Sequence, residues 1–134
     1  MATWMLVEDE YDLYEMLLAM IQLMGKEGVA FSSGTDALKW IDMVDHGTVH
    51  GELPELALLD IRMPGGVSGL DVSRHLRNSL FMSYTKIVLM TAYKMSAQEV
   101  KDAIRQSGAD LLLYKPLPRL DQLKDILDNV IYQP

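Results

Sequence analysis

The sequence contains no cysteine. Disulfide bonds, thiolate metal sites and cysteine nucleophiles are therefore excluded, and the composition fits a reducing compartment. The chain also lacks an apolar run near the ~20 residues that cross a bilayer. No basic and then apolar leader opens it. From these absences we expect a cytoplasmic protein that does not enter membranes.

Positive charge is scarce as well. Lysine and arginine together number 12, against 19 aspartate and glutamate residues, so the formal net charge is −7. This excess argues against direct nucleic acid binding, because the phosphates would be repelled. Internal repeats and linker-like segments are also missing. The 134 residues, 49% hydrophobic and 23% charged, suit one globular domain spanning 1–134.

Five apolar runs alternate with five segments of helical periodicity. The runs lack polar alternation, which is typical of strands buried on both faces, and they cover 2–7, 29–31, 56–60, 86–91 and 110–114. Helix signals follow each run: an apolar stripe from Leu13 to Met24, Ser33 as a cap, a helix over 70–80, the capping box Ser96–Glu99, and Pro118 as a first helical residue. The alternation predicts an α/β fold, with one doubly wound, five-stranded parallel sheet.

Polar side chains stand where four of these strands end, namely Glu8 and Asp9, Asp60, Thr91, and Lys115. The carboxyl ends of parallel strands share one edge of the sheet, where open α/β sheets bind ligands. A simpler interpretation is a salt bridge from Lys115 to Asp60, with Thr91 only ending a strand. The combination of acids, a hydroxyl and an ammonium on one edge favours a functional site instead.

The predicted carboxylates repel one another. Two charges ~4 Å apart cost about 4 kcal/mol at an effective dielectric constant of 20, so a cation is needed to offset them. Oxygen ligands without sulfur or histidine select Mg²⁺, or else Mn²⁺ or Ca²⁺, over zinc. A carboxylate beside Mg²⁺ can attack phosphorus, and Thr91 and Lys115 can then receive the oxygens of the transferred group.

Two further motifs carry weaker signals. His46 and His50 are four residues apart, but Gly47 and Gly51 interrupt any helix between them, so we interpret both as solvated loop histidines. The glycine-rich segment 65–69 lacks the Gly-Lys-Ser/Thr ending of a nucleotide-binding loop. We interpret it as a flexible loop beside the site.

Together the motifs resemble the receiver domain of two-component response regulators. The resemblance covers nearly the whole chain and rests on four motifs, each at the end of a strand: Glu8-Asp9, Asp60 with Met63-Pro64 following, Thr91-Ala92, and Lys115-Pro116. It implies a flavodoxin-like (βα)5 fold with strand order 2-1-3-4-5. It also implies a regulatory domain rather than an enzyme, catalysing only its own phosphorylation and dephosphorylation.

The resemblance also implies roles for single residues. Asp60 would accept a phosphoryl group from a sensor histidine kinase or a phosphotransfer protein. Asp9, Asp60 and the backbone carbonyl of Arg62 would bind Mg²⁺, with Glu8 nearby through water. Thr91 and Lys115 would hold phosphoryl oxygens. The phosphorylated form would present a changed surface to a downstream effector, to an output domain, or to a second copy in a homodimer.

The sequence departs from the family pattern at the expected output switch. Members often carry an aromatic residue three positions before the lysine, where this chain has Leu112, whereas Tyr114 directly precedes Lys115. Arg62 and Tyr93 each follow a site residue by two positions, and we hypothesise that they cover the phosphoryl group and slow its hydrolysis.

Two alternatives remain at this point. One is a small Mg²⁺-dependent phosphatase with an aspartyl intermediate, although the haloacid-dehalogenase type needs a second aspartate where Arg62 stands. The other is a degenerate receiver that acts as a phosphorylation-independent interaction module. The complete set of acids, hydroxyl and lysine argues against it.

Overall fold

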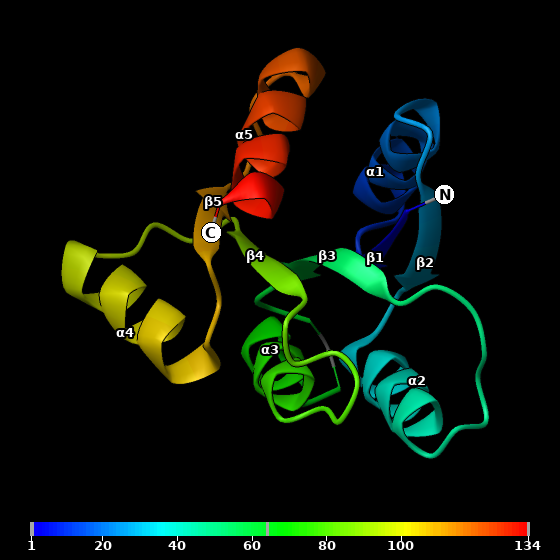
Figure 1. Ribbon diagram of the computed structural model, residues 1–134. Helices are drawn as coiled ribbons and strands as arrows, with labels where there is room; N and C mark the ends of the chain where they lie inside the picture. Colours follow the sequence, from blue (N-terminus) through cyan, green and yellow to red (C-terminus); the bar gives the residue numbers. More distant parts are fainter. Residues whose placement is uncertain (1, 64, 134) are drawn as a thin grey trace.

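Strands and helices alternate along the chain in the computed structural model, which describes residues 2–63 and 65–133 (Figure 1). The strands are β1 (Thr3–Val7), β2 (Glu27–Phe31), β3 (Pro54–Asp60), β4 (Lys86–Thr91) and β5 (Leu111–Tyr114). The helices are α1 (Tyr11–Leu23), α2 (Gly34–Asp45), α3 (Gly69–Arg77), α4 (Ala97–Ser107) and α5 (Leu120–Tyr132). The predicted α/β class and the alternation of strand and helix are confirmed.

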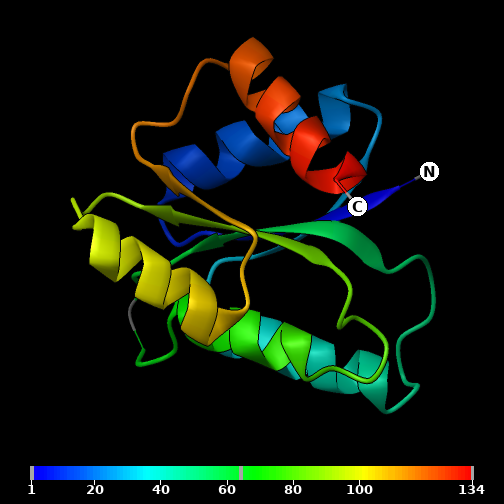
Figure 2. The same ribbon diagram turned by 60° about the vertical axis from the view of Figure 1, so that its left-hand side comes forward.

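All strand pairs are parallel, and the order is β2-β1-β3-β4-β5, as the resemblance implied. Figure 2 shows the sheet between two helical layers, with α1 and α5 on one face and α2, α3 and α4 on the other. In the register between β3 and β4, Asp60 lies opposite Met90, and between β4 and β5 Thr91 lies opposite Tyr114. The ends of these three strands therefore stand at one edge.

The core consists of two apolar layers, one on each face of the sheet. Alternate residues of the central strands enter different layers, because successive side chains of a strand point to opposite faces. Leu58 faces the layer that contains α1 and α5, whereas Ala57 and Leu59 face the layer of α2, α3 and α4. Burial on both faces explains why these strands show no polar alternation in the sequence.

Some element boundaries differ from the predictions. Helix α3 ends at Arg77 rather than Leu80, because the Ser79 hydroxyl donates to Asp45 and accepts from the Met82 amide, which fixes a turn there. Helix α5 begins at Leu120, so Pro118 lies in the connection before it and is not its first residue. That helix starts where Leu123, its first buried residue, can reach the core.

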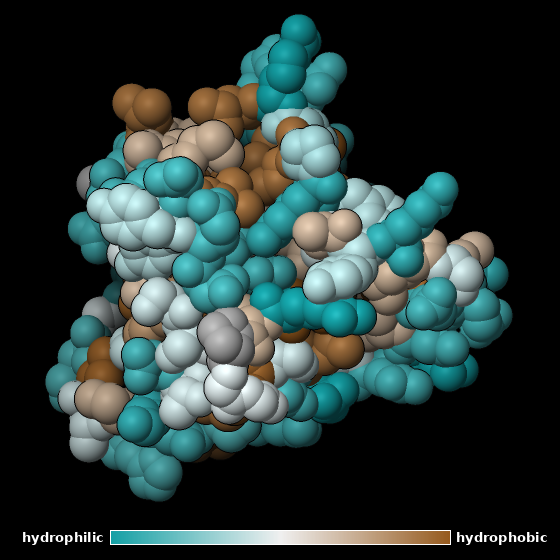
Figure 3. Space-filling view, turned by 180° about the vertical axis from the view of Figure 1, so that it is seen from behind, coloured by the Kyte–Doolittle hydropathy of each residue, from teal (hydrophilic) through white to brown (hydrophobic). Residues whose placement is uncertain are grey.

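Apolar side chains also gather on the surface where α1 and α5 meet (Figure 3). They surround a hollow of about 220 Å³ and include Met20, Leu23, Met24 and Leu120. Among the described residues, none of the helices is both long enough and apolar enough to cross a bilayer.

Candidate functional site

The acidic run after β1 divides between a helix cap and the site. The Glu10 carboxylate accepts hydrogen bonds from the amides of Asp12 and Leu13, and so caps α1. The Glu8 side chain is fully buried, and one of its oxygens accepts from the Glu10 amide at 3.0 Å. Asp9 between them is exposed. Capping therefore needs only one of the three acids.

Asp60 ends β3 and is 5% exposed. Behind it lies Gly69, the first residue of α3, whose amide donates to the Ile61 carbonyl at 3.0 Å. A Cβ at Gly69 would lie 2.2 Å from the Asp60 backbone oxygen, so the helix approaches this closely only because residue 69 has no side chain. The interpretation of 65–69 as a flexible loop was wrong for Gly69, which belongs to the helix. Pro64 lies outside the described residues.

Lys115 reaches the two buried acids from the end of β5. Its Nζ atom is 2.7 Å from Glu8 Oε1 and 3.3 Å from Asp60 Oδ2. The lysine backbone is also fixed, because its amide donates to the Thr91 carbonyl at 2.8 Å. The ion pair with Glu8 was not predicted, since the sequence suggested only a link between Lys115 and Asp60.

The crowding of acids perturbs two titrating groups. Burial, followed by the negative charge of Glu8, raises the pKa of Asp60 from 3.8 to about 7, although Lys115 opposes the shift. Burial disfavours the Lys115 ammonium, but the hydrogen bond and charge of Glu8 outweigh this effect and raise the lysine pKa. Lys115 is therefore charged, and it does not neutralise the acids around it.

The carboxylates are grouped closely enough to share a metal ion. Oxygen atoms of Glu8, Asp9 and Asp60 all lie within 4.8 Å of one another, the one such group of three or more potential ligand residues among those described. Three acids, of which Glu8 and Asp60 are buried, face one ammonium, which leaves an excess of negative charge. An oxygen-only donor set with this excess fits a hard divalent cation such as Mg²⁺.

Thr91 is buried at the end of β4, and its hydroxyl oxygen accepts a hydrogen bond from the Tyr93 amide at 3.1 Å. Its hydroxyl proton stays available to another acceptor. Tyr93 itself is 52% exposed, and the Arg62 guanidinium carbon lies 3.7 Å from the centre of its ring. The sequence placed Arg62 and Tyr93 near the site, but this contact could not be predicted from their spacing.

The β5 end differs from the usual family pattern in the way the sequence suggested. Leu112 is buried in the layer of α2, α3 and α4. Tyr114 is partly exposed, and its hydroxyl donates to the Met95 carbonyl at 3.2 Å. The aromatic side chain at this edge therefore contacts the β4–α4 loop from a different position along the strand.

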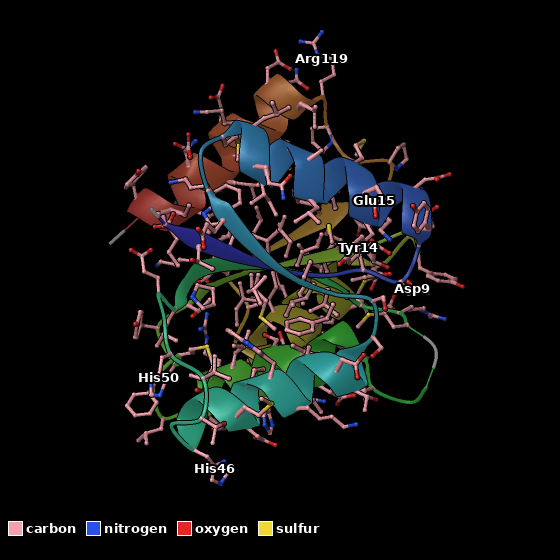
Figure 4. The ribbon with its side chains drawn as sticks, turned by 90° about the vertical axis from the view of Figure 1, so that its right-hand side faces the viewer. Asp9, Tyr14, Glu15, His46, His50 and Arg119 are labelled. Atoms are coloured by element: carbon pink, nitrogen blue, oxygen red, sulfur yellow. The ribbon has the colours of Figure 1, made fainter. Side chains whose placement is uncertain are left out.

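The two loop histidines lie away from the acids. Figure 4 shows His46 at the end of α2 and His50 in the connection to β3, with Asp9 on the other side of the view. The His46 Nδ1 atom lies 2.7 Å from the Asp42 carbonyl oxygen. Both histidines are exposed, which fits the interpretation of solvated loop residues.

The structure thus brings together Glu8, Asp9, Asp60 and Lys115, and it places Thr91 beside them on β4. Arg62 follows Asp60 with its side chain on Tyr93. The individual roles of these residues in metal and phosphoryl binding stay predictions. Gly69 is the site residue that the sequence interpretation missed, and its place between a loop and a helix start was the available signal.

Comparison with known proteins gives a consistent result. The family model of the response regulator receiver domain matches residues 5–128. The polar-differentiation response regulator DivK of Brucella ovis is 31% identical over 128 residues, which cover 93% of this chain and 95% of DivK.

Solved structures show the same fold. The chemotaxis protein CheY4 of Vibrio cholerae has a TM-score of 0.80 at 22% identity, covering 97% of this chain and 98% of CheY4. The response regulator TrrA of Thermotoga maritima, in complex with Mg²⁺ and beryllium fluoride, has a TM-score of 0.74 at 28% identity. That match covers 97% of this chain and 99% of TrrA.

Proposed function

The chain belongs to the response regulator receiver domain family, and on this basis we propose that Asp60 accepts a phosphoryl group in a Mg²⁺-dependent reaction. The supporting observation is the placement of Lys115 between two buried carboxylates, at 2.7 Å from Glu8 and 3.3 Å from Asp60. From this position the Lys115 ammonium can exchange its contact with Asp60 for one with the phosphoryl oxygens while it stays paired with Glu8. The domain acts as a regulatory element and modifies only itself.

The donor is a phosphohistidine of a sensor histidine kinase or of a phosphotransfer protein. An Asp60 carboxylate oxygen attacks phosphorus, the phosphorus–nitrogen bond breaks, and the leaving imidazole keeps the electron pair and takes a proton. The attack needs the carboxylate form, although the pKa of Asp60 is raised to about 7. Asp9, Asp60 and the Arg62 carbonyl would hold Mg²⁺, with Glu8 nearby through water, and the ion would favour the carboxylate and offset the phosphoryl charge.

Lys115 and Thr91 then hold the oxygens of the transferred group. Lys115 contributes a point charge, and Thr91 donates its hydroxyl proton. To reach the phosphoryl group, Thr91 moves inward and gives up its bond from the Tyr93 amide, which alters the β4–α4 loop. The altered surface is read by a downstream effector, an output domain or a second copy of the chain.

The two rival functions have less support. A haloacid-dehalogenase-type phosphatase needs an acid at residue 62, where an arginine side chain rests on Tyr93 instead. A degenerate interaction module has no use for buried acids that destabilise the fold, whereas Glu8 and Asp60 are both buried here.

The experiment uses phosphoramidate, a small donor with a phosphorus–nitrogen bond, and intact-mass measurement. We expect the wild-type chain to gain one phosphoryl group with Mg²⁺ and to gain none with EDTA. Asp60→Asn should gain none in either condition. An unmodified wild-type chain, or equal modification of Asp60→Asn, would overturn the proposal.

A further inference from the structure

Arg62 and Tyr93 form a bridge between two loops beside Asp60. Arg62 follows β3 and Tyr93 follows β4, and these strands are neighbours in the sheet. The guanidinium carbon lies 3.7 Å from the ring centre. Among residues 2–63 and 65–133, none of the carboxylates lies within ion-pair distance of this guanidinium. The permanently charged side chain two residues after Asp60 is therefore paired with a ring.

The charge balance of the site explains this placement. When all three acids are ionised, they and one ammonium leave two negative charges in excess, which one divalent cation would cancel. With the divalent cation bound, the charges of the site cancel without a second side-chain cation. The Arg62 side chain is exposed, and the face of the exposed Tyr93 ring attracts it weakly.

Phosphorylation would change the balance. An acyl phosphate carries about two negative charges, where the Asp60 carboxylate carried one, so the site regains an excess of about one. Arg62 lies two residues along the chain and can supply the missing charge. Guanidinium groups also match phosphoryl oxygens in geometry, since two N–H groups can donate in parallel.

We propose that Arg62 is a stored cation: it rests on the Tyr93 ring while Asp60 is unmodified and moves to the phosphoryl oxygens once Asp60 is phosphorylated. This inference rests on the proposed function and extends it to the output. The ring of Tyr93 is released at the moment when Thr91 gives up its bond from the Tyr93 amide. Both events act on the β4–α4 loop. At the other end of this loop, the Met95 carbonyl accepts a hydrogen bond from the Tyr114 hydroxyl.

The release route does not involve residue 112, where the family often has an aromatic side chain. Leu112 is buried and has no polar group that could follow Thr91. Tyr93 is already at the surface, so its ring can become available to a partner without a rotation through the core. The phosphorylated chain therefore presents a free aromatic face on the β4–α4 loop.

The affinity for beryllium fluoride, a stable phosphoryl mimic, tests the inference by calorimetry in the presence of Mg²⁺. Arg62→Gln should weaken binding at least threefold, because the stored cation is lost. Tyr93→Leu should strengthen binding about two- to fivefold, because the ring no longer competes for the cation. Tyr93→Phe keeps the ring and should match the wild type. Arg119→Gln removes an exposed arginine far from Asp9 (Figure 4) and controls for net charge.

A fixed lid makes a different prediction, because both variants would break the same cover and shift the affinity in the same direction. Shifts of the same sign, or no shift in either variant, would overturn the stored-cation inference. The side-chain protons of Arg62 provide a second readout by NMR. Their ring-current shift should be present in the unmodified wild type and Tyr93→Phe, and should disappear on binding; persistence of the shift would also overturn the inference.

Failure of the proposed function would look different. In that case the wild-type chain would bind no beryllium fluoride and would gain no phosphoryl mass from phosphoramidate. A wild type that binds and is phosphorylated, with affinities unaffected by Arg62→Gln and Tyr93→Leu, would contradict only the role of Arg62.

Discussion

Arg77 and Lys115 are both partly buried cations, but their surroundings differ. Arg77 lies at the amino ends of β4 and β5, and Lys115 lies at the carboxyl end of β5. Arg77 donates to the carbonyls of Gly108, Ser83 and Thr85 and to the Asp110 carboxylate, which also accepts from the Ile87 amide. Every charge in this group has a partner. Lys115 instead faces an excess of acids that it does not neutralise.

The difference separates a structural cluster from a functional one. A balanced, buried polar cluster stabilises a single arrangement, because each group loses its partner if the chain moves. An unbalanced cluster costs stability until a ligand arrives, and that cost makes the site responsive to a cation or a phosphoryl group. Variants of the two clusters should therefore change stability in opposite directions.

Arg77→Ala should have the largest effect on stability. It removes four donated hydrogen bonds, one of them to the carbonyl of the buried Thr85, so we expect a loss of about 3 kcal/mol in the free energy of unfolding. Urea unfolding measures this loss. Arg77→Lys is the matched variant, since it keeps the charge but cannot bond all four acceptors. If the lysine variant were as stable as the wild type, charge rather than bonding would hold this edge together.

Gly69→Ala should cost about 2–3 kcal/mol, because the added Cβ would overlap the Asp60 backbone oxygen. Pushing α3 away should also weaken Mg²⁺ binding, measured by thermal shift with and without the ion. Gly25→Ala serves as a control, since that glycine has a positive φ of 76° but open space around it. It should lose about 1 kcal/mol without any change in Mg²⁺ response. If Mg²⁺ raised the melting temperature of both variants equally, the position of Gly69 would have no effect on Mg²⁺ binding.

Asp60→Asn should stabilise the metal-free chain above neutral pH. The pKa of Asp60 is about 7 in the fold and 3.8 ordinarily, so the folded state binds the extra proton between these values. Wild-type stability therefore falls as pH rises through this window, while the asparagine variant escapes this loss. We expect the variant to be more stable by about 1–2 kcal/mol at pH 8, allowing for screening, and equal at pH 4. Thermal unfolding in EDTA measures both; a wild type that gains stability over this range relative to the variant would contradict the assignment.

Arg105→Ala should have the smallest effect. Its guanidinium pairs with Asp102 at 3.0 Å on the exposed surface of α4, so the charges are balanced but not buried. Such pairs contribute about 0–0.5 kcal/mol. Urea unfolding measures the free energy of unfolding. If Arg105→Ala lost nearly as much of it as Arg77→Ala, pairing of charges alone, without burial, would explain the stability that Arg77 contributes.

The sequence predicts these two clusters unequally well. Glu8, Asp60 and Lys115 each follow an apolar strand, and parallel topology brings such positions to one edge, so their convergence follows from the fold class. The partners of Arg77 come from two separate segments, one directly before β4 and one between α4 and β5. Because no periodicity links them, Arg77 resembles any other arginine of a helix end.

Close contacts and boundaries are likewise beyond sequence patterns. No sequence pattern shows that Gly69, unlike Gly65 and Gly66, approaches Asp60 closely, because this approach depends on the angle of α3. The end of that helix at Arg77 depends on the side chains of Ser79 and Asp45, which are 34 residues apart. Arg62 and Tyr93 were placed near the site by counting from Asp60 and Thr91, but their stacking is a property of two loops in space.

The position of the phosphoryl group decides whether Asp60 is the phosphoacceptor. Borohydride reduces an aspartyl phosphate to homoserine, and fragmentation of the peptide by mass spectrometry locates the reduced residue. After reaction with phosphoramidate and Mg²⁺, we expect homoserine at position 60 alone. Homoserine at another acidic position, or its absence from a phosphorylated chain, would contradict the claim that Asp60 is the phosphoacceptor.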